Sequence, residues 1–233
     1  MIMEGKQVLL TGGTGGLGLG VTPEVVKRGA KVTIPYRDET EVKRLKDKLS
    51  PTDFEKIRFV KANLLEENVV KQLVNDLNRV DVLIHLVGGF SMGKTHKQSY
   101  EDWKSTIDLN LNSTFLLCKY CLGAMYQSGY GRIVTVGSRG AVQPDANLGS
   151  YCASKAGVVA LTQSIAEETK ELNITANSVL PSVIDTPANR EAMGDDNVSN
   201  WVSPHSLAQV ICFLASEAAK DIRGSAIPVY GQV

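Results

Sequence analysis

Residues 7–18 read QVLLTGGTGGLG, an apolar run that leads into a glycine-rich turn. The run over 7–11 predicts a buried strand, and a helix-like segment over 16–28 follows it directly. Glycines in such a turn permit positive φ and let the backbone approach a pyrophosphate, while free N–H groups at the helix start attract the anion. A lone glycine run would equally fit a flexible turn. The strand before it and the helix after it favour dinucleotide binding.

Strand-like and helix-like segments alternate along the rest of the chain. Strands are expected over 7–11, 31–36, 57–61, 81–87, 132–137, 174–180 and 226–229. Helices are expected over 16–28, 39–49, 66–78, 100–128, 150–171 and 204–216. This alternation predicts a parallel sheet covered on both faces. Pro23 lies inside the first helix, so we expect a kink or a late, shortened helix there.

Length and composition favour one domain over residues 1–233 that acts on a small molecule. The 25 basic and 25 acidic residues cancel, with no basic tail or block, so nucleic acid and anionic membranes are not expected partners. No apolar run reaches the about 18 residues that a membrane span needs. The first residues, MIMEGK, lack the pattern of a signal peptide. We therefore expect a cytoplasmic location.

The four cysteines fit the reduced thiols of a cytosolic protein. Cys118-x-x-Cys121 looks like half of a zinc knuckle, but no second Cys or His pair stands at ligand spacing. No metal site is expected.

A hydroxyl, a phenol and an amine converge in the region after the strand at 132–137. Ser138 follows that strand, whereas Tyr151 and Lys155 lie four apart on the next helix and so share a face. A free tyrosine has a pKa near ~10, and an ammonium about 5 Å away at an effective dielectric of about 20 favours the phenolate by roughly 3 kcal/mol. Ser138 would orient a carbonyl oxygen beside the phenol. A surface helix also carries such pairs, so the rest of the chain must decide.

Charged residues follow the second strand, where a dinucleotide-binding fold places the group that recognises the adenosine ribose. An acid there accepts hydrogen bonds from the ribose hydroxyls, whereas an arginine pairs with a 2′-phosphate. The chain offers both types, Arg37 and then Asp38. A solvated turn is the remaining alternative.

Three further features stand out along the chain. His85 ends the fourth strand, where a satisfied structural histidine is the more common interpretation and a cofactor contact the less common one. Asn110 lies inside the helix expected over 100–128. Asparagine is unfavourable inside a helix, so we expect its side chain to have a function. Residues 185–203 have weak helical periodicity and are a candidate substrate lid.

Together these motifs resemble the short-chain dehydrogenase/reductase family over nearly the whole chain, and within it the bacterial 3-oxoacyl-acyl-carrier-protein reductase-like members. Thr11-Gly-x-x-x-Gly16-x-Gly18 matches the cofactor loop, and Tyr151 and Lys155 have the usual spacing. The resemblance implies an α/β, doubly wound Rossmann fold with a seven-stranded parallel sheet in the order 3-2-1-4-5-6-7. It also implies NAD(P)H-dependent hydride transfer between a carbonyl and an alcohol.

The resemblance implies a role for each matched residue. In the catalytic set, Ser138 positions the carbonyl, Tyr151 is the general acid or base, Lys155 lowers the pKa of the phenol and holds the nicotinamide ribose, and Asn110 holds a proton-relaying water. The implied cofactor contacts are Thr11, Gly12, Thr14, Gly16, Leu17, Gly18, Arg37, Asn63, Leu64, Gly88, Tyr151, Lys155, Pro181, Ile184 and Thr186.

The chain departs from the family pattern at three places. The family's Asn-Asn-Ala-Gly is HLVG at 85–88, its adenine-binding aspartate is Asn63, and its Pro-Gly pair is Pro181-Ser182. The altered segment at 85–87 motivates an alternative function, a non-catalytic NADP(H)-binding or redox-sensing protein on the same fold. The complete proton-transfer set argues for the enzyme.

Cofactor choice and assembly are the last expectations. Tyr36 occupies the position of the acid in NAD-binding members and Arg37 that of the base in NADP-binding ones, so NADP(H) is favoured over NAD(H). Two residues weaken this preference for NADP(H). Asp38 is acidic and would repel a 2′-phosphate, and Gly15 stands where NADP-binding relatives often carry a second base. A homotetramer is implied, built partly through the helices that begin near Tyr100 and Ser150.

Overall fold

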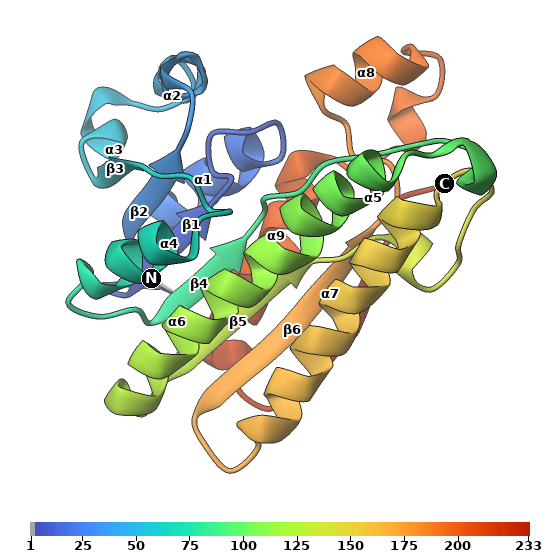
Figure 1. Ribbon diagram of the computed structural model, residues 1–233. Coiled ribbons are helices and arrows are strands. Elements are labelled where there is room, and N and C mark those ends of the chain that lie inside the picture. Colours follow the sequence, from blue (N-terminus) through green and yellow to red (C-terminus); the bar gives the residue numbers. More distant parts are fainter. Residues whose placement is uncertain (1–2) are drawn as a thin grey trace.

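Seven parallel strands form the central layer of the computed structural model, which describes residues 3–233 (Figure 1). The strands are β1 Gln7–Thr11, β2 Lys31–Tyr36, β3 Ile57–Lys61, β4 Val82–His85, β5 Gly131–Val136, β6 Ile174–Pro181 and β7 Ala226–Val229. Their order across the sheet is β3-β2-β1-β4-β5-β6-β7. This confirms the expected doubly wound α/β fold, in which the first and fourth strands lie side by side at the centre.

Helices cover both faces of the sheet. They are α1 Gly18–Lys27, α2 Glu39–Lys46, α3 Pro51–Phe54, α4 Glu67–Asn75, α5 Tyr100–Ile107, α6 Ser113–Ser128, α7 Gly149–Glu168, α8 Pro187–Met193 and α9 Pro204–Leu214. One apolar cluster packs α1 and α9 against the sheet, and a second packs α4, α6 and α7 against the opposite face. Within residues 3–233, no helix combines the length and apolarity that crossing a membrane requires.

The glycine turn after β1 is shaped by close backbone contacts. Gly12 has a left-handed backbone with φ of 72°, and a Cβ there would lie 3.0 Å from the backbone of Leu86. A Cβ on Gly18 would overlap the carbonyl oxygen of Gly12. Helix α1 therefore begins at Gly18, two residues later than its expected start, and it contains Pro23 as anticipated.

The helix expected over 100–128 is present with these bounds, but its winding changes in the middle. Five residues, Asp108–Asn112, form a π-helical turn (η2) between α5 and α6. At this turn the hydroxyls of Ser113 and Thr114 donate to the carbonyl oxygens of Leu109 and Asn110, both at 2.6 Å. Polar side chains that bond to backbone carbonyls compete with the regular helical pattern, and single π turns of this kind gather at functional sites.

Shorter elements differ from the sequence-based boundaries by a few residues. The expected strand over 81–87 narrows to β4, and helix α3 has no counterpart among the expected helices because it has only four residues, capped by Ser50. The candidate lid at 185–203 holds α8 and a 3₁₀ turn at Val198–Asn200. Its two ends meet where Ile184 pairs with Val202.

Substitution of Gly18 tests the packing of the glycine turn. We expect Gly18→Ala to lower the free energy of unfolding by about 2 to 3 kcal/mol, because the new methyl group would force backbone atoms apart. The matched control is Gly15→Ala, whose Cβ would make an ordinary contact of 3.4 Å with the Gly12 oxygen and should cost less than about 0.5 kcal/mol. Urea denaturation of both variants measures the difference. Equal losses would show that the Gly12–Gly18 approach does not limit the turn.

Candidate active site

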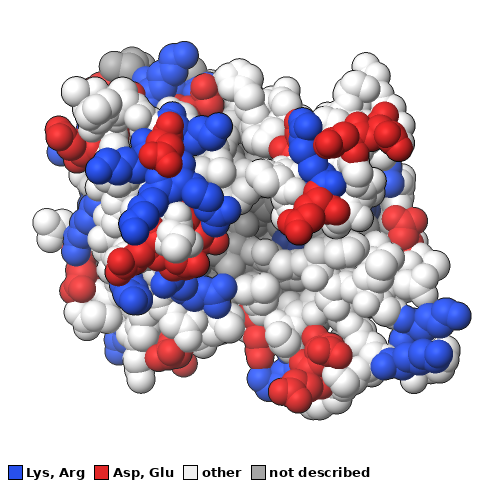
Figure 2. Space-filling view, turned by 90° about the horizontal axis from the view of Figure 1, so that it is seen from above, with Lys and Arg blue, Asp and Glu red and all other residues white. Residues whose placement is uncertain are grey.

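The carboxyl ends of the strands meet along the upper edge of the sheet, between α2 and α8 in the view of Figure 1. Figure 2 looks down on this edge and shows the surface hollowed between the parts of the molecule that carry these two helices. Parallel sheets bind ligands at this edge, where the strand order reverses. The four residues of the expected catalytic set lie on three elements around it: Ser138 follows β5, Asn110 belongs to η2, and Tyr151 and Lys155 belong to α7.

Lys155 is almost completely buried, with 5% of its surface exposed. Its Nζ donates to the carbonyl oxygen of Val136, at the end of β5, over 2.9 Å. Burial penalises the ammonium form and lowers the pKa of Lys155 to about 8. The amine therefore keeps its charge at neutral pH and titrates near the upper end of the physiological range.

Asn110 joins three segments through its carboxamide. Its Nδ2 donates to the carbonyl oxygen of Gly89 at 3.0 Å and to the hydroxyl of Ser154 at 2.9 Å, while its Oδ1 accepts from the N–H of Gly89 at 2.8 Å. A Cβ on the preceding Gly88 would lie 2.8 Å from that Oδ1 and 2.9 Å from the Lys155 amine. Gly88 is the one residue of the HLVG segment that matches the family pattern. Because it has no side chain, the loop after β4 can pass between Asn110 and Lys155.

Tyr151 and the buried Ser138 complete the catalytic set. Burial raises the pKa of the Tyr151 phenol, and the hydrogen bond with Ser138 counteracts part of that rise. The net direction is upward, so the lowered phenol pKa expected from the Lys155 charge is not found in the chain alone. The physical reason is that burial removes the solvation of a phenolate. The ring of Phe90, which is 66% exposed, lies 5.0 Å from that of Tyr151, centroid to centroid.

The glycine loop reaches the lid through Thr186. A Cβ on Gly16 would lie 3.2 Å from the Cβ of Thr186, so these two expected cofactor contacts stand side by side. The Thr186 hydroxyl also accepts from the N–H of Asn189 and caps α8. Because side chains are missing along the loop where backbone must approach a ligand, its shape fits a pyrophosphate. Leu17 and Ile184 pack against the core beside it.

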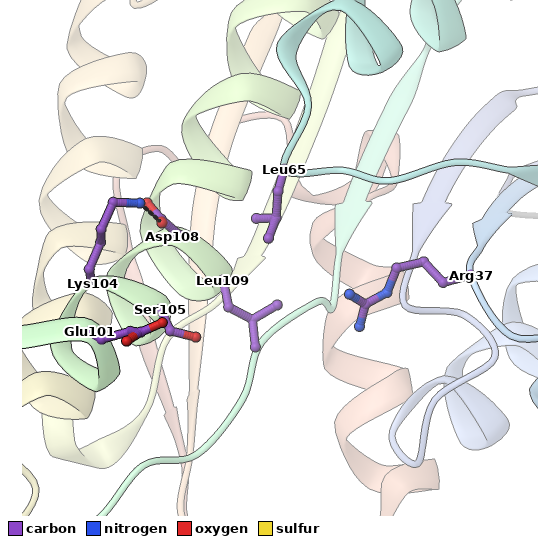
Figure 3. Close-up of a pocket in the computed structure, with 7 residues that line it drawn as sticks. All are labelled: Arg37, Leu65, Glu101, Lys104, Ser105, Asp108 and Leu109. Atoms are coloured by element: carbon purple, nitrogen blue, oxygen red, sulfur yellow. Dashed lines mark hydrogen bonds and ion pairs between the residues drawn. The ribbon is translucent and has the colours of Figure 1, made fainter. Parts of the chain in front are cut away.

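A cavity of about 330 Å³ lies between Arg37, Leu65 and the helical run of α5 and η2 (Figure 3). Leu65 and Leu109 approach it from different elements, and Arg37 extends toward it from the end of β2. The remaining lining residues are Glu101, Lys104, Ser105 and Asp108. Sequence reasoning identified Arg37 but missed the two leucines, whose meeting depends on the tertiary structure.

Two of the three departures from the family pattern, at Asn63 and at Ser182, have structural explanations in local hydrogen bonds. Asn63 forms a local turn, with its amide donating to Glu66 and its oxygen accepting from the N–H of Leu65. The neighbouring Leu64 side chain is buried in the core, so the exposed side chain at this edge is that of Leu65. After Pro181, the Ser182 hydroxyl donates to the carbonyl oxygen of Tyr230 at 2.6 Å and ties the end of β6 to the segment after β7.

His85 is a buried, neutral, hydrogen-bonded residue beneath the site. Its Nδ1 lies 2.7 Å from the hydroxyl of Thr11 and its Nε2 lies 3.4 Å from that of Ser113. Burial, together with the Lys155 charge, lowers the pKa of His85 to about 3. This matches the structural interpretation of the histidine, because the ring links β1, β4 and α6.

Comparison with known proteins agrees with this arrangement. The family model for short chain dehydrogenases matches residues 6–197. The chain belongs to the short-chain dehydrogenase family. This dehydrogenase is 30% identical to the 3-oxoacyl-[acyl-carrier-protein] reductase of Salmonella typhimurium, over 99% of the chain and 98% of the relative.

Solved structures resemble this short-chain dehydrogenase over almost its full length. A short chain dehydrogenase/reductase family protein has a TM-score of 0.90 at 30% identity and covers 99% of the chain and 98% of its own. An actinorhodin polyketide ketoreductase with NADPH has a TM-score of 0.88 at 26% identity, over 97% of the chain and 96% of its own. These relatives support an NAD(P)H-dependent oxidoreductase that acts on a carbonyl or an alcohol.

The buried His85 should make the protein sensitive to acid. Its pKa in the folded chain, about 3, lies below the ordinary value of 6.5, so the unfolded chain binds more protons between these pH values and stability falls as pH falls through them. At pH 5 this loss amounts to about 2 kcal/mol. We expect His85→Asn to flatten the pH dependence of urea denaturation between pH 6.5 and 4.

The exposed His96 provides the matched control, since His96→Asn removes a histidine from the surface loop without altering the buried group. Its pH profile should follow that of the wild type. An unchanged slope in His85→Asn would show that other groups cause the acid sensitivity.

Proposed function

We propose that this dehydrogenase reduces a small-molecule carbonyl with NADPH, with Tyr151 as the general acid. The observation that carries the proposal is the convergence of a hydroxyl, a phenol and a buried amine at the end of β5, next to a loop held by Asn110. In the reverse reaction, alcohol oxidation, the same residues act and Tyr151 accepts the proton of the alcohol hydroxyl as a general base. The nicotinamide, when bound, supplies the hydride that goes to the carbonyl carbon.

Each residue has a physical task in the proton transfer. Ser138 donates a hydrogen bond to the carbonyl oxygen, which develops negative charge as the carbon accepts hydride. Tyr151 then gives its phenolic proton to that oxygen. The phenolate left behind needs a nearby cation, and Lys155, with a pKa of about 8, supplies one at neutral pH.

Asn110 contributes a main-chain group in this proposal. Its carboxamide is already engaged with Gly89 and Ser154, so the side chain holds the backbone in place. Its carbonyl oxygen accepts a hydrogen bond from the Thr114 hydroxyl, and a carbonyl oxygen has two lone pairs. In the proposed mechanism this carbonyl oxygen also binds the water that returns a proton to Tyr151 through Lys155.

The preference for NADP(H) over NAD(H) is supported by the surroundings of Arg37. Its guanidinium extends toward the cavity and is paired with none of the other residues drawn there (Figure 3). Asp38 is engaged elsewhere and forms no pair with Arg37: its carboxylate accepts a hydrogen bond from the N–H of Thr40 at 2.8 Å and caps α2. The related polyketide ketoreductase was solved with NADPH, which agrees with this preference.

The substrate is proposed only as a carbonyl compound small enough to reach Tyr151 beside the exposed ring of Phe90. A 3-oxoacyl thioester is one candidate, because the relative from Salmonella typhimurium is a 3-oxoacyl-[acyl-carrier-protein] reductase. The altered segment at 85–87 no longer favours a non-catalytic sensor, since His85 has a structural task. The proposal includes a cytoplasmic location, supported by four buried cysteines without disulfides.

Substitution of the phenol tests the proposed chemistry. Tyr151→Phe keeps the ring but removes the proton, so we expect turnover to fall by about two to four powers of ten while the dissociation constant of NADPH changes little. The assay follows NADPH consumption with a panel of ketones, aldehydes, quinones and acyl thioesters. A variant that retains more than about a tenth of the wild-type rate would assign the proton transfer to another group.

The homotetramer is also part of the proposal. Aromatic side chains on α6, Phe115 and Tyr126, are 48% and 47% exposed, and Ala153 and Ala160 are exposed on α7. Gly157, in contrast, packs on Leu111 of the same chain, so the small-residue face of α7 is only partly free.

Light scattering measures the assembly directly. We expect four times the mass of one chain at micromolar concentration, and we expect Phe115→Glu to reduce it, because a charge would be buried between helices. Glu substitution of the exposed Leu172, which lies after α7, is the matched control and should leave the mass unchanged. A monomer in the wild type would contradict the proposed assembly.

A further inference from the structure

We propose that Glu41 is a second cofactor-selecting residue, which opposes Arg37 and disfavours a 2′-phosphate on the adenosine ribose. The proposal rests on the proposed function, because it concerns the same cofactor site. Its consequence is that this enzyme discriminates between NADPH and NADH less sharply than Arg37 alone would dictate.

The carboxylate of Glu41 is fixed to the glycine loop. The Oγ1 of Thr14 donates to its Oε2 at 2.9 Å, although the two residues are 27 positions apart in the chain. Thr14 is only 3% exposed, whereas the side chain of Glu41 is 36% exposed, so the contact joins the buried loop to a partly exposed carboxylate. A hydroxyl of the loop that is expected to bind phosphate is therefore engaged with an acid of this chain.

Glu41 lies in the first turn of α2, one turn after Arg37. Arg44 approaches it at 3.7 Å, but that side chain is 60% exposed and its charge is largely screened by water. The Glu41 carboxylate, about a third exposed, thus stands between α2 and the glycine loop, four residues after Arg37.

The two side chains prefer different forms of the ribose. A carboxylate accepts hydrogen bonds and has none to donate, so it suits a free 2′-hydroxyl and repels a 2′-phosphate. A guanidinium has the opposite preference. Asp38, which the sequence suggested as the acid at this position, caps α2 instead, so the acidic role passes to Glu41.

The decisive variant is Glu41→Gln. The amide oxygen of glutamine can still accept from Thr14, so the change removes the charge and keeps the contact. Glu39→Gln is the matched control, because Glu39 lies in the same first turn of α2 and is exposed. Thermal unfolding of both variants checks that they remain folded.

Binding of four probes gives the readout without catalysis. Isothermal titration with NADPH, NADH, 2′,5′-ADP and 5′-AMP should show Glu41→Gln binding NADPH and 2′,5′-ADP about tenfold tighter at low ionic strength, with NADH and 5′-AMP no tighter than before. Glu39→Gln should change the ratio of NADPH to NADH affinity by less than about threefold, since exposed charges are screened. The gain in Glu41→Gln should shrink in about 0.5 M salt.

Each other result has a distinct meaning. An unchanged NADPH to NADH ratio in Glu41→Gln, or an equal change in Glu39→Gln, overturns the role of Glu41. Failure of the wild type to bind any of the four probes overturns the proposed cofactor use itself. Arg37→Ala separates the two ideas, because loss of NADPH preference there supports the phosphate-binding role of Arg37 whether or not Glu41 opposes it.

Discussion

The carboxamide of Asn110 is the constraint on which the site depends. Its three hydrogen bonds hold both backbone groups of Gly89 and the hydroxyl of Ser154, so that η2, the loop after β4 and helix α7 keep fixed positions relative to one another. The loop passes so close to Asn110 and Lys155 that Gly88 has no space for a side chain. Buried amides are costly unless all their groups are paired, and here nearly all of them are. The orientation of the catalytic helix thus follows from a polar group that could not remain in place unsatisfied.

Two basic side chains are buried around this point, and the structure keeps only one of them charged. His85 is neutral because burial and the neighbouring ammonium both disfavour its protonation. Lys155 retains a charge at neutral pH despite a lowered pKa. A buried amine reduces stability relative to an apolar side chain of the same size, a compromise that is common where a site needs a charge away from water. The replacement of the family's asparagine by His85 is compatible with this balance because its ring nitrogens find the hydroxyls of Thr11 and Ser113.

Much of the fold was predictable from local patterns. The apolar runs place the strands along the chain, and the four-residue spacing of Tyr151 and Lys155 places both on one helix face. The order of the strands, in contrast, was implied by the family resemblance. What escaped prediction depends on contacts between distant segments. The cavity between Leu65 and Leu109, the bond from Thr14 to Glu41 and the partners of His85 all join residues that no local pattern connects. The π-helical turn escaped for a different reason, since its residues also fit an ordinary helix until the side-chain bonds to carbonyl oxygens are known.

That turn also means that the site is encoded by the number of residues as well as by their types. A π turn holds an additional residue compared with an α-helical one, and each residue of an α-helix rotates the chain by about 100°. A chain shortened by one residue between Asp108 and Asn112 would form a more regular helix, yet α5 and α6 would be turned relative to each other by that angle. The asparagine would still be present in the sequence, while its amide pointed away from Gly89. A family member with such a deletion would match every motif and still lack the geometry.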